Sequence, residues 1–103
     1  MRRYRLSMIP GGVSPAVHVS KGDTGYSVRF ILEGFSVPSG ASVAIEGIGT
    51  SHDCAYSGSN VDAPINADMT AKAGVFPAEI VIRHNGERIG TANIALCVEE
   101  GIE

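Results

Sequence analysis

Tryptophan is absent from this chain of 103 residues, and its aromatic residues are three Tyr and three Phe. Charged residues are also scarce, at 18% of the chain against about 25% in an average globular protein. Eight Lys and Arg stand against 11 Asp and Glu, and the resulting net charge of −3 disfavours a protein that binds nucleic acid by neutralising phosphates. Because 44% of the residues are hydrophobic, the chain has enough apolar surface to offset chain entropy, which excludes intrinsic disorder.

Long hydrophobic runs are also missing: none approaches the roughly 18 residues of a membrane span. The charged start Met1–Arg5 resembles the beginning of a signal peptide, but the apolar stretch Leu6–Pro10 is too short to complete one. We therefore expect a soluble protein made in a cytoplasm. Two cysteines, Cys54 and Cys97, are too few for a disulfide framework, and they are either reduced apolar residues or a single pair.

The length predicts one domain over residues 1–103, with an N-terminal segment at 1–13. Strand signals dominate the chain. The run Tyr26–Leu32 alternates apolar and polar residues, which is typical of a half-buried strand. Shorter strands are expected at residues 16–19, 41–46 and 52–57, separated by turns rich in Gly, Pro and Ser.

The last third predicts a long hairpin, from Val75–Arg83 to Glu87–Val98. Its even-numbered residues form the apolar face: Phe76, Ala78, Ile80, Ile82, Ala92, Ile94, Leu96 and Val98. Placing this set on one side favours a three-residue loop, His84-Asn85-Gly86, with Arg83 opposite Glu87. A two-residue loop at Asn85-Gly86 would instead put Arg83 opposite Arg88, a like-charge pair.

One segment departs from the strand pattern. Asn66–Gly74 holds helix-forming residues between a capping Asn and a terminating Gly, and predicts a short helical turn near residues 67–73. The whole pattern predicts an all-β fold, an antiparallel β-sandwich of seven or eight strands that is immunoglobulin-like or related, with this one helical turn.

Sequence motifs for catalysis or ligand binding are weak. Lys21–Gly25 resembles a phosphate-binding loop, but it lacks the P-loop order and precedes a strand, so we interpret it as a turn. Ser36 lies in Gly34–Pro38, where a proline replaces the glycine that a nucleophile elbow needs. Carboxylates at Glu33, Glu46, Glu79 and Glu87 fall on separate strands, with no spacing that pairs them for acid–base chemistry.

Metal-capable residues are present without the spacing of a zinc site. His52 and Cys54 would share one strand face, whereas His84 at the hairpin tip is most simply a solvated loop residue. The complete set is His18, His52, Asp53, Cys54, His84 and Cys97. We predict no catalytic, cofactor-binding or metal site, and no cofactor.

Charges gather at both ends of the chain. Arg2, Arg3 and Arg5 either attract acidic partners or lie near the acidic end, Glu99, Glu100 and Glu103. A second open choice concerns the odd-numbered face of the hairpin, with Ile89, Thr91, Ala95 and Cys97. This face is more apolar than a solvent face requires, so either the second sheet or a partner covers it.

Three segments together resemble a known family. They are Lys21–Gly25 before an aromatic strand, Met69–Gly74 followed by Ala78-Glu79-Ile80, and Ile89–Ile94 followed by Val98-Glu99-Glu100. In order and spacing they resemble the N-terminal domain of phage baseplate upper proteins, found in tailed phages and prophages of Gram-positive bacteria. The resemblance covers residues 14 to 100.

The resemblance implies a non-enzymatic assembly module of the virion tail baseplate. Its protein partners would be the distal tail protein, onto which such domains dock, and, through further parts, receptor-binding proteins. Longer members continue into a helical stalk, so residues 99–103 would begin a helical linker, and a trimer is expected only if that helix follows. The alternative function is a carbohydrate-binding or cell-surface adhesion module of immunoglobulin-like shape.

Overall fold

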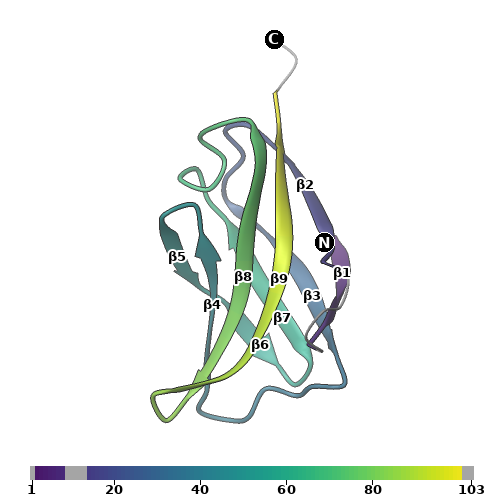
Figure 1. The fold of residues 1–103 in the computed structure, drawn as a ribbon, viewed down its shortest axis with the longest axis vertical. Helices are drawn as coiled ribbons and strands as arrows, with labels where there is room; N and C mark the ends of the chain where they lie inside the picture. The colour runs from purple at the N-terminus through teal and green to yellow at the C-terminus, as the bar shows by residue number, and fades with distance from the viewer. Residues whose placement is uncertain (1, 9–13, 101–103) are drawn as a thin grey trace.

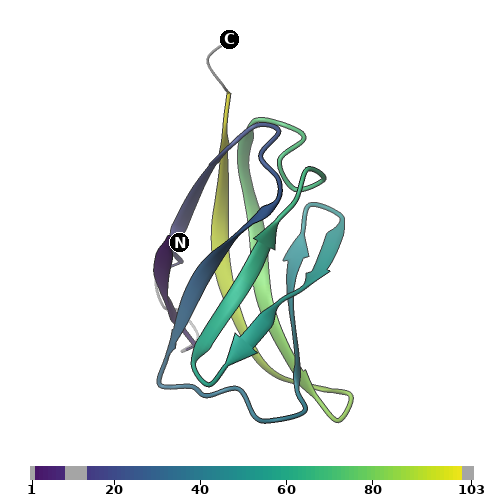
Figure 2. The same ribbon diagram turned by 180° about the vertical axis from the view of Figure 1, so that it is seen from behind.

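The chain folds into a β-sandwich in a computed structural model that describes residues 2–8 and 14–100 (Figure 1). The described strands form one four-stranded sheet, in the order β1-β3-β7-β6, and one five-stranded sheet, in the order β2-β9-β8-β4-β5. Figure 2 shows the four-stranded sheet from its own side. The strands are β1 (Arg3–Ser7), β2 (Ala16–Ser20), β3 (Tyr26–Glu33), β4 (Ser42–Gly47), β5 (Thr50–Asp53), β6 (Ala55–Ser57), β7 (Asn60–Ile65), β8 (Gly74–His84) and β9 (Glu87–Glu99).

The expected sandwich is confirmed, but its sheets are mixed rather than antiparallel. β1 runs parallel to β3, and β2 runs parallel to β9. Both parallel pairs join strands that are not consecutive in the chain, so no hairpin turn imposes the antiparallel direction. The chain places β1 on the edge of one sheet and β2 on the edge of the other. On the opposite side of the sandwich, the chain likewise changes sheets at Cys54, because β5 lies on the edge of the five-stranded sheet and β6 on the edge of the four-stranded one.

The core lies between the two sheets and is built from alternating residues, as the sequence predicts. Phe30, Ile80 and Leu96 are completely buried at its centre. The even-numbered face of the β8–β9 hairpin points into the core along its length, and Phe76 is the one half-buried member of the predicted set. Tyr26, at the start of β3, is 36% exposed, whereas the next members of its face are buried.

The hairpin loop is shorter than predicted. Arg83 lies opposite Arg88, so Asn85 and Gly86 form a two-residue loop with φ of 52° and 79°. The predicted face survives because the register shifts between Ile82 and Arg83, which leaves Ile89 as an extra, bulged residue. The like-charge pair is tolerated because each arginine has a carboxylate partner elsewhere in the five-stranded sheet: Arg83 binds Glu46 at 2.7 Å, and Arg88 lies 3.8 Å from Glu79.

No helix forms in the described residues, so the predicted helical turn near 67–73 is wrong. The segment makes single turns, in which Met69 donates its N–H to the Asn66 carbonyl and Thr70 donates to the Ala67 carbonyl. So few residues cannot repay the cost of nucleating a helix. Gly74 starts β8 with φ of 141° instead of ending a helix.

The chain ends fall partly outside the described residues. Within the predicted N-terminal segment, the structure shows β1. Glu99 is the last residue of β9 rather than the start of a linker, and residues 101–103 of the predicted linker lie outside the described part. Across residues 2–8 and 14–100, no helix is long and apolar enough to cross a membrane.

Candidate interaction surface

Two of the metal-capable residues, His18 and Cys97, lie opposite each other on the paired strands β2 and β9. Within the described ranges, His, Cys, Asp and Glu form no group of three that could hold a metal ion. His52 belongs to β5, and Cys54 follows the end of this strand, where the chain passes to β6 in the other sheet. The Cys54 thiol is buried in the core, and this burial raises its pKa to about 12. Both cysteines are unpaired in the structure, and Cys97 is half-buried.

The other two histidines have different surroundings. His18 lies 3.2 Å from the Glu99 carboxylate on the neighbouring strand. His84 is half-buried and approaches Gly40, rather than being the freely solvated loop residue that we expected. Its Nδ1 is buried without a hydrogen-bond partner among the described residues.

The 21–25 segment is a turn, in line with its interpretation from sequence. Asp23 stabilises it by accepting hydrogen bonds from the Ser20 N–H at 3.0 Å and from the Tyr26 hydroxyl at 2.7 Å. These bonds, the backbone bond first, hold the pKa of Asp23 below its ordinary value. The Asp23 side chain is thus occupied within the turn.

The terminal charges do not pair as one alternative suggested. Glu99 and Glu100 pair with His18 and Lys21 instead of the N-terminal arginines. Arg5 lies 3.9 Å from the Glu33 carboxylate, in the other sheet. Glu103 lies outside the described residues.

A pocket of about 340 Å³ opens beside the start of β8, toward the end of the sandwich where β9 ends. It lies between the β4–β5 turn, the 66–73 turn and the start of β8. Its floor is apolar, with buried Met69 and half-buried Phe76, and Ile48 stands 37% exposed at its rim. We call it the end pocket, and its lining is Ile48, Asp68, Met69, Ala71, Lys72 and Phe76.

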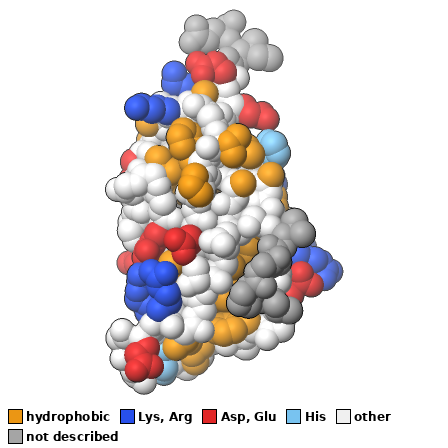
Figure 3. Space-filling model, in the orientation of Figure 1, with side chains coloured by type: hydrophobic (Ala, Val, Ile, Leu, Met, Phe, Trp, Pro, Cys, Tyr) orange, Lys and Arg blue, Asp and Glu red, His pale blue; other side chains and the backbone are white. Residues whose placement is uncertain are grey.

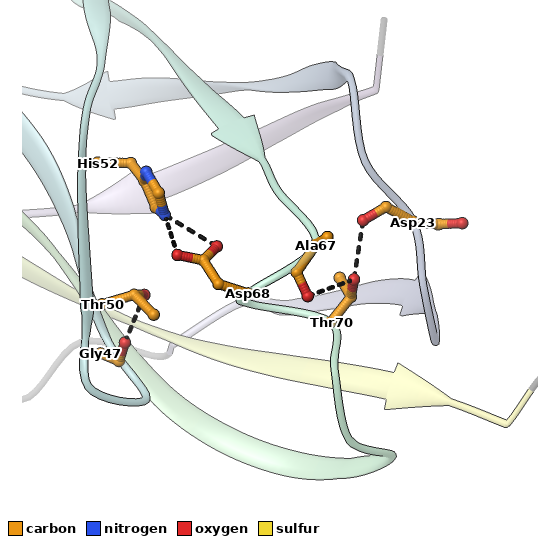
Figure 4. Close-up of polar contacts among 7 residues, drawn as sticks. All are labelled: Asp23, Gly47, Thr50, His52, Ala67, Asp68 and Thr70. Atoms are coloured by element: carbon orange, nitrogen blue, oxygen red, sulfur yellow. Dashed lines mark hydrogen bonds and ion pairs between the residues drawn. The ribbon is translucent and has the colours of Figure 1, made fainter.

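Hydrogen bonds fix the 66–73 wall of the end pocket on two sides (Figure 4). His52 Nε2 lies 2.8 and 2.9 Å from the two oxygens of Asp68, which ties this segment to β5. On the other side, the buried Thr70 hydroxyl donates to the Asp23 carbonyl at 2.8 Å. The Gly22 N–H donates in turn to the Thr70 carbonyl at 3.0 Å. These bonds hold the wall in place from both sides.

The β4–β5 turn forms the other wall and has an unusual residue. Gly47 pairs with Thr50, so Ile48 and Gly49 form a two-residue loop with φ of 56° and 70°. Positive φ at both positions is the type I′ pattern, which favours Asn-Gly. A β-branched residue in this left-handed region is an outlier. The Thr50 hydroxyl donates to the Gly47 carbonyl at 2.8 Å and braces the turn (Figure 4).

The outer face of the five-stranded sheet carries an apolar patch beside this end. Val75, 71% exposed, lies opposite Cys97, and Pro77 lies opposite Ala95, which also neighbours Ala16. We call these five residues the outer patch. Figure 3 shows orange side chains gathered on this face, over the upper parts of β8 and β9. The second sheet packs on the even-numbered face, so it does not cover the odd-numbered one.

The end pocket was not predicted from the sequence. Its walls come from three turns or strand ends that are distant in the chain. One feature of the sequence could have pointed to it. Ile48 precedes Gly49 in a tight turn between two strands, at a position where turns usually have a polar residue.

The fold, but not the sequence, has a match among known proteins. No protein-family profile matches the chain, and no curated protein matches it. In structure it is similar to the N-terminal domain of phage TP901-1 ORF48, with a TM-score of 0.65 and 10% sequence identity. The match covers 96% of this chain and 99% of that one. At this identity the likeness establishes a shared fold.

Proposed function

We propose that this protein is a structural module of a phage or prophage tail baseplate, where it docks onto the distal tail protein and supports the parts that adsorb to the host. The fold carries this proposal. It matches the N-terminal domain of a phage protein over nearly the full length of both chains. That match is independent of the residue pattern that resembles baseplate upper proteins, and both point to a phage tail.

A non-enzymatic role agrees with the use of the strand carboxylates. Glu46 and Glu79 form ion pairs with arginines on adjacent strands, and Glu33 lies near Arg5. The arginine beside Glu46 lowers the pKa of that carboxyl, which keeps it ionised rather than poised to carry a proton. These groups stabilise the sheets and form no convergent site.

The carbohydrate-binding alternative receives less support, because sugar sites commonly use an exposed aromatic platform. Phe30 is buried, and Tyr4 packs against it with ring centroids 5.8 Å apart. The Tyr56 hydroxyl is bound to the Ala41 carbonyl at 2.6 Å. Tyr26 is the most exposed aromatic of the described chain, and its hydroxyl is already bound to Asp23.

Co-expression with the distal tail protein of the same phage or prophage tests the proposal. We expect a complex that survives affinity purification and gel filtration. An unrelated β-sandwich protein with the same affinity tag serves as the control for nonspecific capture. Separate elution of the two proteins, together with clear binding of this chain to a glycan array, would favour the adhesion module instead.

A further inference from the structure

We propose that the end pocket receives an apolar side chain from an acidic segment of a partner protein, and that Lys72 pairs with a carboxylate of that segment. This inference deepens the baseplate function and rests on it, because it locates the surface through which the module docks. The main observation behind it is that Ile48 and Lys72 both lie at the rim of the same pocket, around an apolar floor.

Ile48 is the first reason to expect a partner. The chain contains the same tight turn twice, and at the second one Asn85 occupies the position that Ile48 has in the first. Asn adopts the left-handed conformation readily, whereas a β-branched side chain is strained there. The strained isoleucine places an apolar side chain at the pocket rim, and such strain tends to occur where a side chain has a function.

Charge at the rim specifies the chemistry of the occupant. Asp68 is engaged by His52, with both carboxylate oxygens within 2.9 Å of Nε2. Lys72 is exposed and forms no ion pair with any carboxylate in the described ranges, whereas Lys21 pairs with Glu100. The rim therefore offers an unpaired cation beside apolar surface, although the whole chain has a net charge of −3. An acidic segment satisfies this cation, and a basic one does not.

The size and surroundings of the pocket favour a protein segment. Its volume of about 340 Å³ lies at the low end of the range for small-molecule sites, which is about 300–1,000 Å³. Val75 directly precedes Phe76 of the floor, and its side chain is exposed on the opposite, outer face of the five-stranded sheet, in the outer patch. A partner chain that wraps around this end of the sheet can contact both areas, and specific protein interfaces need about 1,000 Å² or more in total.

This inference can be tested without the natural partner by titrating the ¹⁵N-labelled protein with short peptides and measuring the NMR chemical shifts of its backbone amides. The probes are acetyl-Glu-Leu-Glu-amide, acetyl-Lys-Leu-Lys-amide and acetyl-Glu-Ser-Glu-amide, with maltotriose as the sugar. We expect saturable shifts near Ile48, Met69 and Lys72 with the first peptide at millimolar concentration, and weaker ones with the others. Equal shifts with the lysine peptide, stronger shifts with the sugar, or no response at these amides would overturn the inference.

Two pairs of variants sharpen the test. Lys72→Glu should weaken binding of the acidic peptide about fivefold, and Arg3→Glu, the same charge change on an exposed residue of the other sheet, should not. Ile48→Asn should abolish the pocket shifts, and Ile89→Asn, at a residue 39% exposed against 37% for Ile48, should leave them. Unchanged binding in both pocket variants contradicts the inference. If the distal tail protein still binds when the peptides do not, the docking surface is wrong and the proposed function stands.

Discussion

Ile48 and Asn85 occupy the same position in two tight hairpin turns of one sheet, with φ of 56° and 52°. Both are followed by a glycine of positive φ. The Asn85 turn has the residue that this geometry favours, and the Ile48 turn does not. The difference falls at the rim of the end pocket, which links the strained residue to the surface that we propose for docking.

Replacing Ile48 with Asn should stabilise the fold. The substitution relieves left-handed strain that costs an ordinary residue about 1–2 kcal/mol, and the lost side chain is 37% exposed. Urea denaturation should show a gain of about 1 kcal/mol in the free energy of unfolding. The reverse change at the other hairpin, Asn85→Ile, should lose a similar amount. A loss of stability in Ile48→Asn would show that the turn is not strained.

Removing the Thr70 hydroxyl should destabilise the protein. Thr70→Val keeps the shape of this buried side chain but leaves the Asp23 carbonyl without its donor. An unsatisfied buried group costs about 1–3 kcal/mol, to be measured as a lower free energy of unfolding. Thr24→Val, at an exposed position, is the matched control and should change stability by less than about 0.5 kcal/mol. Equal stabilities of the two variants would contradict the role of Thr70.

Local patterns in the sequence predicted the core well. Alternation alone identified the inward face of β8 and β9, because a half-buried strand repeats every two residues. The same signal was present for β7, where Val61, Ala63 and Ile65 are all buried, but Pro64 between them weakened it. Pro64 is tolerated because the partner β6 pairs only with Asn60 to Asp62.

Features set by distant parts of the chain were not predictable. The predicted hairpin loop was wrong because a bulge at Ile89 lets a two-residue loop keep the even-numbered face inward, and part of what accommodates this register lies outside the hairpin. Glu46 of β4 neutralises Arg83, which makes the Arg83–Arg88 pair acceptable. The parallel pairings of β1 and β2 likewise have no local signal, since strand direction is decided by the route of the chain.

The two cysteines should differ in reactivity. Burial raises the pKa of Cys54 to about 12 and also blocks access, whereas Cys97 lies half-buried on the outer patch. Iodoacetamide at mildly alkaline pH should modify Cys97 of the native protein and reach Cys54 only after denaturation, as peptide mass spectrometry would show. Equal labelling of both, or labelling of neither without a reductant, would contradict the structure.

Acid should weaken one cross-strand ion pair in particular. Arg29 binds Asp62 through two contacts of 2.7 and 3.0 Å, which hold the pKa of Asp62 below its ordinary 3.8. The stabilisation is thus present above pH 3.8 and is lost as the pH falls through the lower, folded-state pKa. Asp62→Asn should be less stable than wild type at neutral pH, by about 1 kcal/mol, and the gap should close in acid.

The control for this pH dependence is Glu33→Gln. Glu33 lies 3.9 Å from Arg5, and the two side chains are 53% and 78% exposed. Such an exposed pair contributes little to stability, so the difference from wild type should stay near zero at every pH. A gap for Asp62→Asn that stays constant into acid would show that the Arg29 pair is not its cause.

Binding of the purified chain to the purified distal tail protein of its own phage or prophage tests the central claim most directly. Calorimetry should show saturable binding with a micromolar or tighter dissociation constant. Ile48→Asn and Lys72→Glu should weaken it, and Ile89→Asn and Arg3→Glu should leave it unchanged. No association of the wild-type proteins at high micromolar concentration would contradict the role of this domain as a baseplate docking module.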